Sequence, residues 1–379
     1  LLGPGNDFFT EDGRPVRPQP SAHTLQKVFS GSALDLNAMK DDEEDDEFSA
    51  AVAEPSDVAA ADSQQSASGA TVTTILSQLS CESERERSKA LKNKTTVLVV
   101  GGNGYVACHV VAKLLDAGYS VRITVSEPLD SAEQLEIYST VPDAGHRLSI
   151  TEASVTNPGA FREVLRGCKY VVHCGVSPAQ AQREKDIIRA HLESVAALFD
   201  AIRLNGKPSV KRVVLTGSAA AVFHIQDPVP PSGVFNEQMW NTRATAISDP
   251  VPFAKLSFER EAWRLQKMFG VELVVMLPSI VIGPSLLHET SEAMRTIHDL
   301  ASGSPYFPFA PNLYWNFVDV RDVAEAHVRA MEHPDISEQR IIVSTDCLSL
   351  SEIGALIKKS HPHLSPPTYS APSWITLIV

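Results

Sequence analysis

Three small residues stand where a phosphate group could be held. Gly101, Gly104 and Ala107 follow the apolar run of residues 97–100, in the order Gly-Gly-Asn-Gly-Tyr-Val-Ala. Such glycines allow a sharp turn and a close approach of the backbone to a pyrophosphate. The small third residue lets a helix lie near a strand, and the N–H groups at the helix N-terminus attract the anion. The pattern predicts a dinucleotide site, although a tight turn without a ligand would use the same residues.

The type of dinucleotide depends on the residues that end the next strand. An acidic side chain there accepts a hydrogen bond from the ribose 2′-hydroxyl of NAD, whereas a basic one pairs with the 2′-phosphate of NADP. Ser126 and Glu127 occupy this place, and Glu127 favours NAD. Arg122 keeps NADP open, and Glu127 could equally be a plain surface residue. The sequence predicts NAD or NADP without choosing between them.

Regular alternation of strands and helices places the glycine loop. Runs rich in β-branched residues predict strands, and the segments between them predict helices. This alternation is typical of an α/β fold with a Rossmann-type, doubly wound parallel sheet, and continuous apolar runs fit strands buried on both sides. The expected strands are residues 96–100, 119–125, 169–173, 212–216 and 271–277, and the expected helices are 105–117, 158–166, 179–203 and 253–269.

The chain is acidic, with a net charge of −13, and much of this charge lies near its N-terminus. Residues 1–94 predict a low-complexity, largely irregular extension that includes the acidic run 41–47, with a helix possible over 71–94. We expect protein partners, of basic character, to bind through this extension. Nucleic acid is not expected as a partner, because an acidic surface repels phosphate. No apolar run is long enough to indicate an integral membrane protein.

The five cysteines are odd in number and lack the spacing of paired thiols or metal ligands. This pattern favours a reducing intracellular compartment, buried unreactive thiols and no metal site. The numbering starts at Leu1 and not at a methionine, so a segment that targets an organelle could have been removed. The compartment itself stays open.

Several separated blocks resemble the extended short-chain dehydrogenase/reductases of the NAD-dependent epimerase/dehydratase type, and in particular the dihydroflavonol reductase and cinnamoyl-CoA reductase group. The resemblance implies a dinucleotide domain over 95–284 with a return segment at 314–332, and a smaller substrate subdomain mostly within 285–379. Besides Gly101, Gly104 and Ala107, it implies cofactor contacts at Tyr105, Val106, Ser126, Glu127, Val155, Lys255, Pro278 and Ile280. The blocks that carry it are the glycine loop and residues 118–125, 166–173, 212–219, 276–284 and 316–334.

The same resemblance assigns catalytic roles. Ser218 matches the serine that orients a substrate carbonyl, and Lys255 matches the lysine of a Tyr-x-x-x-Lys motif, whose tyrosine exchanges a proton with the carbonyl oxygen. Val251 occupies the tyrosine position, and valine cannot donate a proton. None of the seven tyrosines lies between Ser218 and Gly283. Ser218 and Lys255 also have simpler interpretations, as a strand cap and a solvated helix residue.

Two other departures from the family's pattern also favour a loss of catalytic or cofactor-binding function. Ser126 replaces the family's basic residue after the second strand, and Ser154 replaces the acidic residue expected near the adenine. His224, Ser248 and Asp249 could supply a proton if their loop folded inward.

Two functions fit these residues. One is a non-catalytic, structural or accessory subunit of a larger assembly, which keeps the fold and a bound, even vestigial, dinucleotide. The other is an active NAD(P)H-dependent reductase of a small carbonyl substrate with an unusual proton donor. The missing tyrosine favours the first, whereas the intact glycine loop, Ser218 and Lys255 favour the second.

Overall fold

A computed structural model gives the structure of the chain. It describes residues 91–125, 137, 138, 141, 143–153, 157–175, 184–205, 210–286, 291–303, 309–311 and 313–371. The predicted N-terminal extension lies almost entirely outside this described part.

A seven-stranded parallel sheet forms the centre of the molecule, with the strand order β3-β2-β1-β4-β5-β6-β9. The five predicted strands are all present, within one residue of their expected ends. The sequence pattern does not predict β3 and β9, whose burial is only partial. The strands are β1 (Thr96–Val100), β2 (Ser120–Val125), β3 (Leu148–Glu152), β4 (Cys168–His173), β5 (Arg212–Thr216), β6 (Glu272–Pro278) and β9 (Gln339–Val343).

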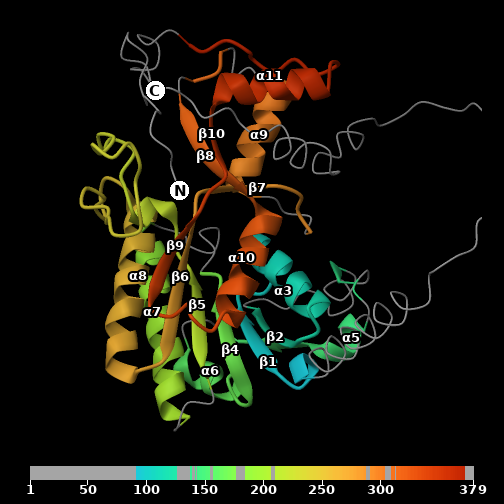
Figure 1. Ribbon diagram of the computed structural model, residues 1–379, viewed down its shortest axis with the longest axis vertical. Coiled ribbons are helices and arrows are strands. Elements are labelled where there is room, and N and C mark those ends of the chain that lie inside the picture. Colours follow the sequence, from blue (N-terminus) through green and yellow to red (C-terminus); the bar gives the residue numbers. More distant parts are fainter. Residues whose placement is uncertain are drawn as a thin grey trace, which may run out of the picture.

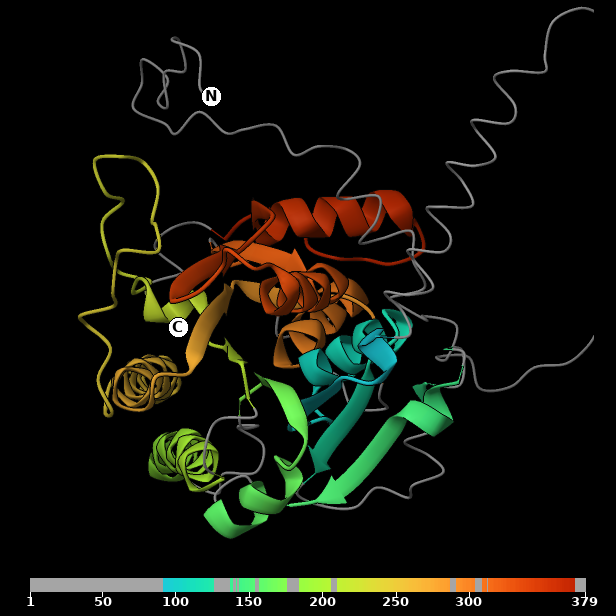
Figure 2. The ribbon, with the colours of Figure 1, turned by 60° about the horizontal axis from the view of Figure 1, so that its bottom comes forward.

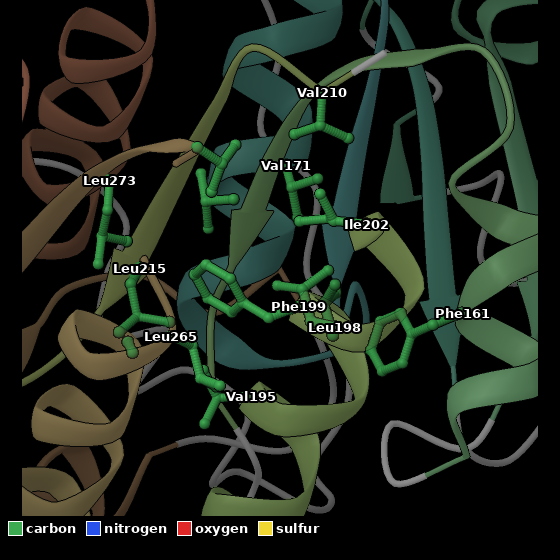
Figure 3. Packing of buried hydrophobic residues seen from close by; sticks show 14 of the residues in the cluster. Phe161, Val171, Val195, Leu198, Phe199, Ile202, Val210, Leu215, Leu265 and Leu273 are labelled. Carbon is green, nitrogen blue, oxygen red and sulfur yellow. The ribbon is translucent and has the colours of Figure 1, made fainter. Parts of the chain in front are cut away.

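Helices cover both faces of this sheet, as predicted (Figures 1 and 2). Alternate residues of one strand point to opposite faces, so Leu98 of β1 contributes to one core cluster and Val99 to another. The first cluster lies under α6 (Pro158–Val164), α7 (Glu184–Leu204) and α8 (Pro250–Phe269), and the second under α3 (Tyr105–Asp116) and α10 (Val320–Glu332). Figure 3 shows the first, where Phe161 and Phe199 meet the strands. The short α5 (Ala144–Arg147) precedes β3.

A smaller unit with its own core lies above the carboxyl ends of the main strands (Figure 1). Its three strands follow the order β10-β8-β7, with β8 parallel to β7 and antiparallel to β10. It consists of β7 (Ile280–Ile282), α9 (Glu292–Ser302), β8 (Tyr314–Asp319), β10 (Asp346–Ser349) and α11 (Leu350–Ser360). The fold class is therefore the predicted one, a Rossmann-type sheet with a smaller C-terminal unit.

A buried ion pair fixes the position of α8, the helix that carries Lys255. Nε of Arg340, in β9, lies 2.6 Å from Oε1 of Glu259 in α8, and both side chains are buried. The Arg340 guanidinium also lies over the Trp240 ring, 3.7 Å from its centroid. A cation over an aromatic face and a buried ion pair hold α8 to the sheet edge and to the loop that precedes it.

Among the described helices, none combines the length and apolarity that crossing a bilayer requires.

Candidate nucleotide site

The glycine loop adopts a conformation that a larger residue would strain. Gly101 has φ +73°, and its N–H donates to Oγ1 of Thr124 at 3.1 Å. A Cβ on Gly102 would lie 2.4 Å from Cβ of Ile123, so the loop can follow β2 only because this position lacks a side chain. The loop therefore brings its backbone as close to the sheet as a bound pyrophosphate requires.

The N-terminus of α3 faces the end of this loop. Gly104 is its N-cap, and no side chain caps the first turn of the helix, which begins at Tyr105 and includes Val106 and Ala107. The N–H groups of that turn have no intrahelical acceptor, and the helix dipole adds partial positive charge there. The residues predicted for the anion site therefore lie together at this turn.

The loop lies at the point where the strand order reverses. β1 has β2 on one side and β4 on the other, and Val100 is in register with His173 of β4. Gly175, just after β4, has φ +89°, and its carbonyl oxygen would lie 3.3 Å from a Cβ on Gly101. Nucleotides bind at such a crevice, outside the carboxyl ends of the strands.

Ser218 follows β5, the next strand in the sheet. It is the N-cap of the short helix η3 (Ala219–Ala221), and its Oγ accepts from the N–H of Ala220 at 3.2 Å. Ser218 therefore caps a short helix, whereas the simpler interpretation had it cap the end of a strand. Because accepting this bond leaves the hydroxyl hydrogen free, a second role as donor to a ligand is compatible with it.

Lys255 reaches the same crevice from α8, which contacts η3. A Cβ on Gly175 would lie 3.0 Å from Nζ of Lys255, so the ammonium lies directly against the turn after β4. Its surroundings are poor in water, and this burial lowers the pKa of Lys255 to about 8, with the Cys174 thiol acting weakly in the opposite direction. Lys255 is thus half-buried and packed against this turn, which favours contact with the crevice over an ordinary solvated position.

Val251 lies one turn before Lys255, near the start of α8, with 42% of its surface exposed. The residues proposed as substitute proton sources are engaged nearby. Nε2 of His224 lies 3.3 Å from Oδ1 of Asp249, while Nδ1 of His224 accepts from the N–H of Gln226. Ser248 hydrogen-bonds to Thr245. His224 and Asp249 thus meet, but they face each other.

Three tyrosines of the dinucleotide domain are also engaged. The hydroxyl of Tyr105, at the glycine loop, donates to the Gly283 carbonyl at 2.8 Å, and burial raises its pKa. The Tyr119 hydroxyl donates to Glu332, far along β2 from the crevice. Burial raises the pKa of Tyr138, which lies near Cys108. These three phenols are poor proton donors for a ligand.

The remaining predicted contacts divide into two groups. Pro278 ends β6 and Ile280 begins β7, at the same edge of the sheet as Ser218. Ser126, Glu127 and Val155 lie outside the described residues. Arg122 was the residue that left NADP possible. It is the third residue of β2, well before the carboxyl end of that strand, and its Nη1 donates to the carbonyls of Val164 and Arg166 and not toward the crevice.

Comparison with known proteins shows which family has this fold and glycine loop. The model of the NAD dependent epimerase/dehydratase family matches residues 97–344. The chain belongs to this family. The predicted membership of the extended short-chain dehydrogenase/reductases is confirmed.

Relatives within the family include plant reductases. Tetraketide alpha-pyrone reductase 2 of Arabidopsis thaliana is 32% identical over 280 residues, which cover 70% of this chain and 83% of the relative. A cinnamoyl-CoA reductase of Medicago truncatula is 31% identical over 277 residues, covering 72% and 82%. Yeast methylglyoxal/isovaleraldehyde reductase, solved in complex with NADPH, superposes with a TM-score of 0.63 at 26% identity, covering 72% and 85%. The chain therefore has the fold of an NAD(P)-binding reductase.

Sequence reasoning missed three contributors to the site. Gly175 and Thr124 shape the loop, and His173 lies beneath it, fully buried. Gly175 lies two residues after a predicted strand, so a glycine just beyond the carboxyl end of the strand next to β1 was the available signal. Nothing in the pattern of β2 singles out Thr124, since threonine is common in strands.

Proposed function

We propose that this member of the family binds NAD(P) in the crevice between the glycine loop and Gly175 but does not turn over carbonyl compounds. The observation that carries this proposal is the side chain at position 251. A hydrocarbon stands four residues before Lys255, where the family's phenol would lie. Loss of a positioned general acid costs about 100- to 10,000-fold in rate.

The surroundings of Val251 support the proposal. The His224 imidazole is directed to Asp249, whose pKa is lowered by hydrogen bonds from Ser248 and His224, so the carboxyl group is ionised and holds no proton at neutral pH. Serine hydroxyls such as that of Ser218 are far too weakly acidic to replace a phenol activated by a lysine. Apart from Lys255, the described proton-bearing side chains proposed at the start of α8, His224 and Ser248, are engaged with Asp249 and Thr245.

Retained binding is supported by the geometry of the loop. Gly101 turns at φ +73° directly before an uncapped helix N-terminus, which is the arrangement that binds phosphate groups in dinucleotide-binding folds. The Lys255 ammonium adjoins the same crevice. We propose NAD or NADP as the dinucleotide, with Glu127 favouring NAD.

A second candidate function is a slow reductase in which the Lys255 ammonium itself supplies the proton. It is favoured by the retention of Ser218 and Lys255 and by the names of the relatives, which are reductases. The hydride would pass from the reduced nicotinamide to the carbonyl carbon, and the proton from Nζ of Lys255 to the oxygen. A pKa of about 8 makes this transfer chemically reasonable.

Binding and turnover distinguish the two. We expect NADH or NADPH fluorescence to change on titration with the purified chain, with micromolar affinity. We then expect no oxidation of the reduced nucleotide, above the uncatalysed rate, with a panel of aldehydes and ketones that includes cinnamoyl-CoA and methylglyoxal. Multiple turnovers on any of them would exclude the first function, and absence of nucleotide binding would exclude both.

We further propose that the acidic extension, residues 1–94, joins this chain to a basic protein partner as an accessory subunit. The charge of the extension supports this, because the run at 41–47 holds seven consecutive carboxylates. The native assembly of the full chain should be heavier than that of a chain without residues 1–90 by more than the mass of the removed residues. A difference equal to the mass of those residues would exclude this role.

A further inference from the structure

Two buried histidines lie beneath the nucleotide site. His173 ends β4 and His191 belongs to α7, and their relative exposures are 0% and 1%. Both rings meet the Phe258 ring of α8 edge to face, with centroid distances of 5.2 and 5.4 Å. Phe258 is one turn after Lys255, so the two imidazoles and the ammonium converge on the same side of α8.

The hydrogen bonds at Nδ1 fix the tautomers of these rings. Nδ1 of His173 accepts from the N–H of Gly175 at 3.0 Å, so a neutral His173 carries its proton on Nε2. Nδ1 of His191 lies 2.9 Å from the Ile187 carbonyl oxygen, which can only accept, so His191 is protonated on Nδ1. Burial lowers the pKa of His173 to about 3 and that of His191 to about 4, so both rings are neutral at pH 7.

The two outer nitrogens are therefore complementary. Nε2 of His173 is a donor and Nε2 of His191 is an acceptor, and neither has a hydrogen-bond partner among the described residues. A buried polar atom left unpaired costs about 1–3 kcal/mol. Two such atoms of opposite type, around one phenyl ring, indicate a small polar occupant that satisfies both.

We propose that a buried water molecule accepts a hydrogen bond from Nε2–H of His173, donates one to Nε2 of His191 and solvates the Lys255 ammonium with its second lone pair. Buried waters make about three hydrogen bonds to polar groups that would otherwise lack partners, as this one would. The proposal deepens the proposed function, because Lys255 belongs to the nucleotide site. It does not depend on a nucleotide being bound.

The groups around Lys255 make its titration sensitive to this water. From β4 it is faced by His173 and by Cys174, whose thiol is neutral because burial raises its pKa to about 12. From α7 it is faced by His191, and on α8 the carboxylate of Glu259 is paired with Arg340. With these neighbours neutral or paired, hydration decides how readily the amine holds its proton.

Competitive labelling of the amine tests this in the nucleotide-free protein. Acetylation of Lys255 by acetic anhydride, followed by peptide mass spectrometry across pH 6–11, should give a midpoint near pH 8 in the wild type. His191→Leu removes the acceptor, and we expect the midpoint to fall by about one pH unit. His191→Gln, which keeps an acceptor, and His146→Leu, at an exposed site, should stay near the wild-type midpoint. An unchanged midpoint in a folded His191→Leu protein would overturn the proposal.

A high-resolution crystal structure of the wild type gives a second test that needs no variant. We expect density for a water within about 3.2 Å of both Nε2 atoms. A dry pocket, or Nε2 atoms bonded to protein groups instead, would refute the proposal. Nucleotide titration of the same wild-type protein separates the two claims, because failure to bind NAD(P) would remove the proposed function without moving the water or the Lys255 midpoint.

Discussion

Nε2 of His224 lies 3.3 Å from Oδ1 of Asp249, and this pair joins the loop after η3 to the first turn of α8. Asp249 is the N-cap of that helix, two residues before Val251. The Gln226 N–H occupies Nδ1 of His224, so the ring proton is on Nε2 and is shared with a carboxylate. The pair therefore orders the entrance to α8 and leaves no spare proton for a ligand at position 251.

Replacing this histidine should affect folding and not nucleotide binding. We expect His224→Ala to lower the free energy of unfolding by about 1–3 kcal/mol, because it leaves a cavity and unpaired polar groups at a buried position. Urea denaturation measures the loss, and the nucleotide Kd should be unchanged. His298→Ala, at an exposed pair with Asp299, serves as the control and should cost less than about 0.5 kcal/mol. Unchanged stability together with a weaker nucleotide Kd would contradict this role of His224.

Because of its backbone conformation, we expect a substitution at Gly101 to weaken nucleotide binding strongly. Gly101→Ala places a Cβ at φ +73° and 3.3 Å from the Gly175 oxygen. We expect a stability loss of about 1 kcal/mol and a nucleotide affinity reduced at least about tenfold, since the loop must shift away from the phosphates. Gly145→Ala, where an added Cβ meets nothing within 4 Å, is the matched control for isothermal titration. Equal affinities for the two variants would contradict the assigned site.

Lys255 should make stability depend on pH in the alkaline range. Its pKa is about 8 in the folded chain and about 10.4 when unfolded, so the buried ammonium destabilises the fold below pH 8. Between these values the unfolded state binds more protons, and stability rises with pH. We expect Lys255→Met to be more stable than the wild type by about 2 kcal/mol at pH 7, and the difference to shrink as pH rises through 8 towards 10. A difference that stays constant across this range would show that the amine is solvated.

Buried neutral histidines should weaken the fold in acid. The pKa of His327 falls to about 4 through burial, and its Nε2 accepts from Oγ1 of Thr216 at 2.7 Å. Below pH 6.5 the unfolded chain takes up protons that the folded chain excludes, so stability falls with pH at about 1.4 kcal/mol per unit for each such histidine. Urea midpoints at pH 5 and 7 should show a shallower loss for His327→Gln than for the wild type. Parallel losses would mean that His327 is solvated.

Much of the fold is readable from the sequence because its strands are buried on both faces. Runs such as residues 212–216 are continuous and apolar, and they emerge as the inner strands of the sheet. The edge strands β3 and β9 escape prediction because each is only partly buried and carries polar residues, which removes the signal. β8 and β10 belong to a small antiparallel sheet whose pairing joins segments about 30 residues apart, and no local pattern records such pairing.

In the site, too, only the residues that are close together in the sequence could be predicted from the sequence pattern. The glycine loop is local and could be predicted from spacing alone, whereas Ser218 and Lys255 come from different elements, and only the family resemblance brings them together before the structure does. The His173 and His191 cluster depends on β4, α7 and α8 meeting around Phe258. Each of these residues has an unremarkable sequence context, so tertiary packing alone reveals the cluster.

The central claim is that a missing phenol, and not a missing nucleotide, keeps this chain from reducing carbonyls, and Val251→Tyr tests it most directly. The exposed surface of Val251 leaves room for the larger ring. Single-turnover oxidation of bound NAD(P)H with a carbonyl substrate should speed up by about 100- to 10,000-fold in Val251→Tyr and not in Val251→Phe, with little change in nucleotide Kd. Wild-type protein that already turns over as fast as Val251→Tyr, or equal rates for the tyrosine and phenylalanine variants, would contradict the account.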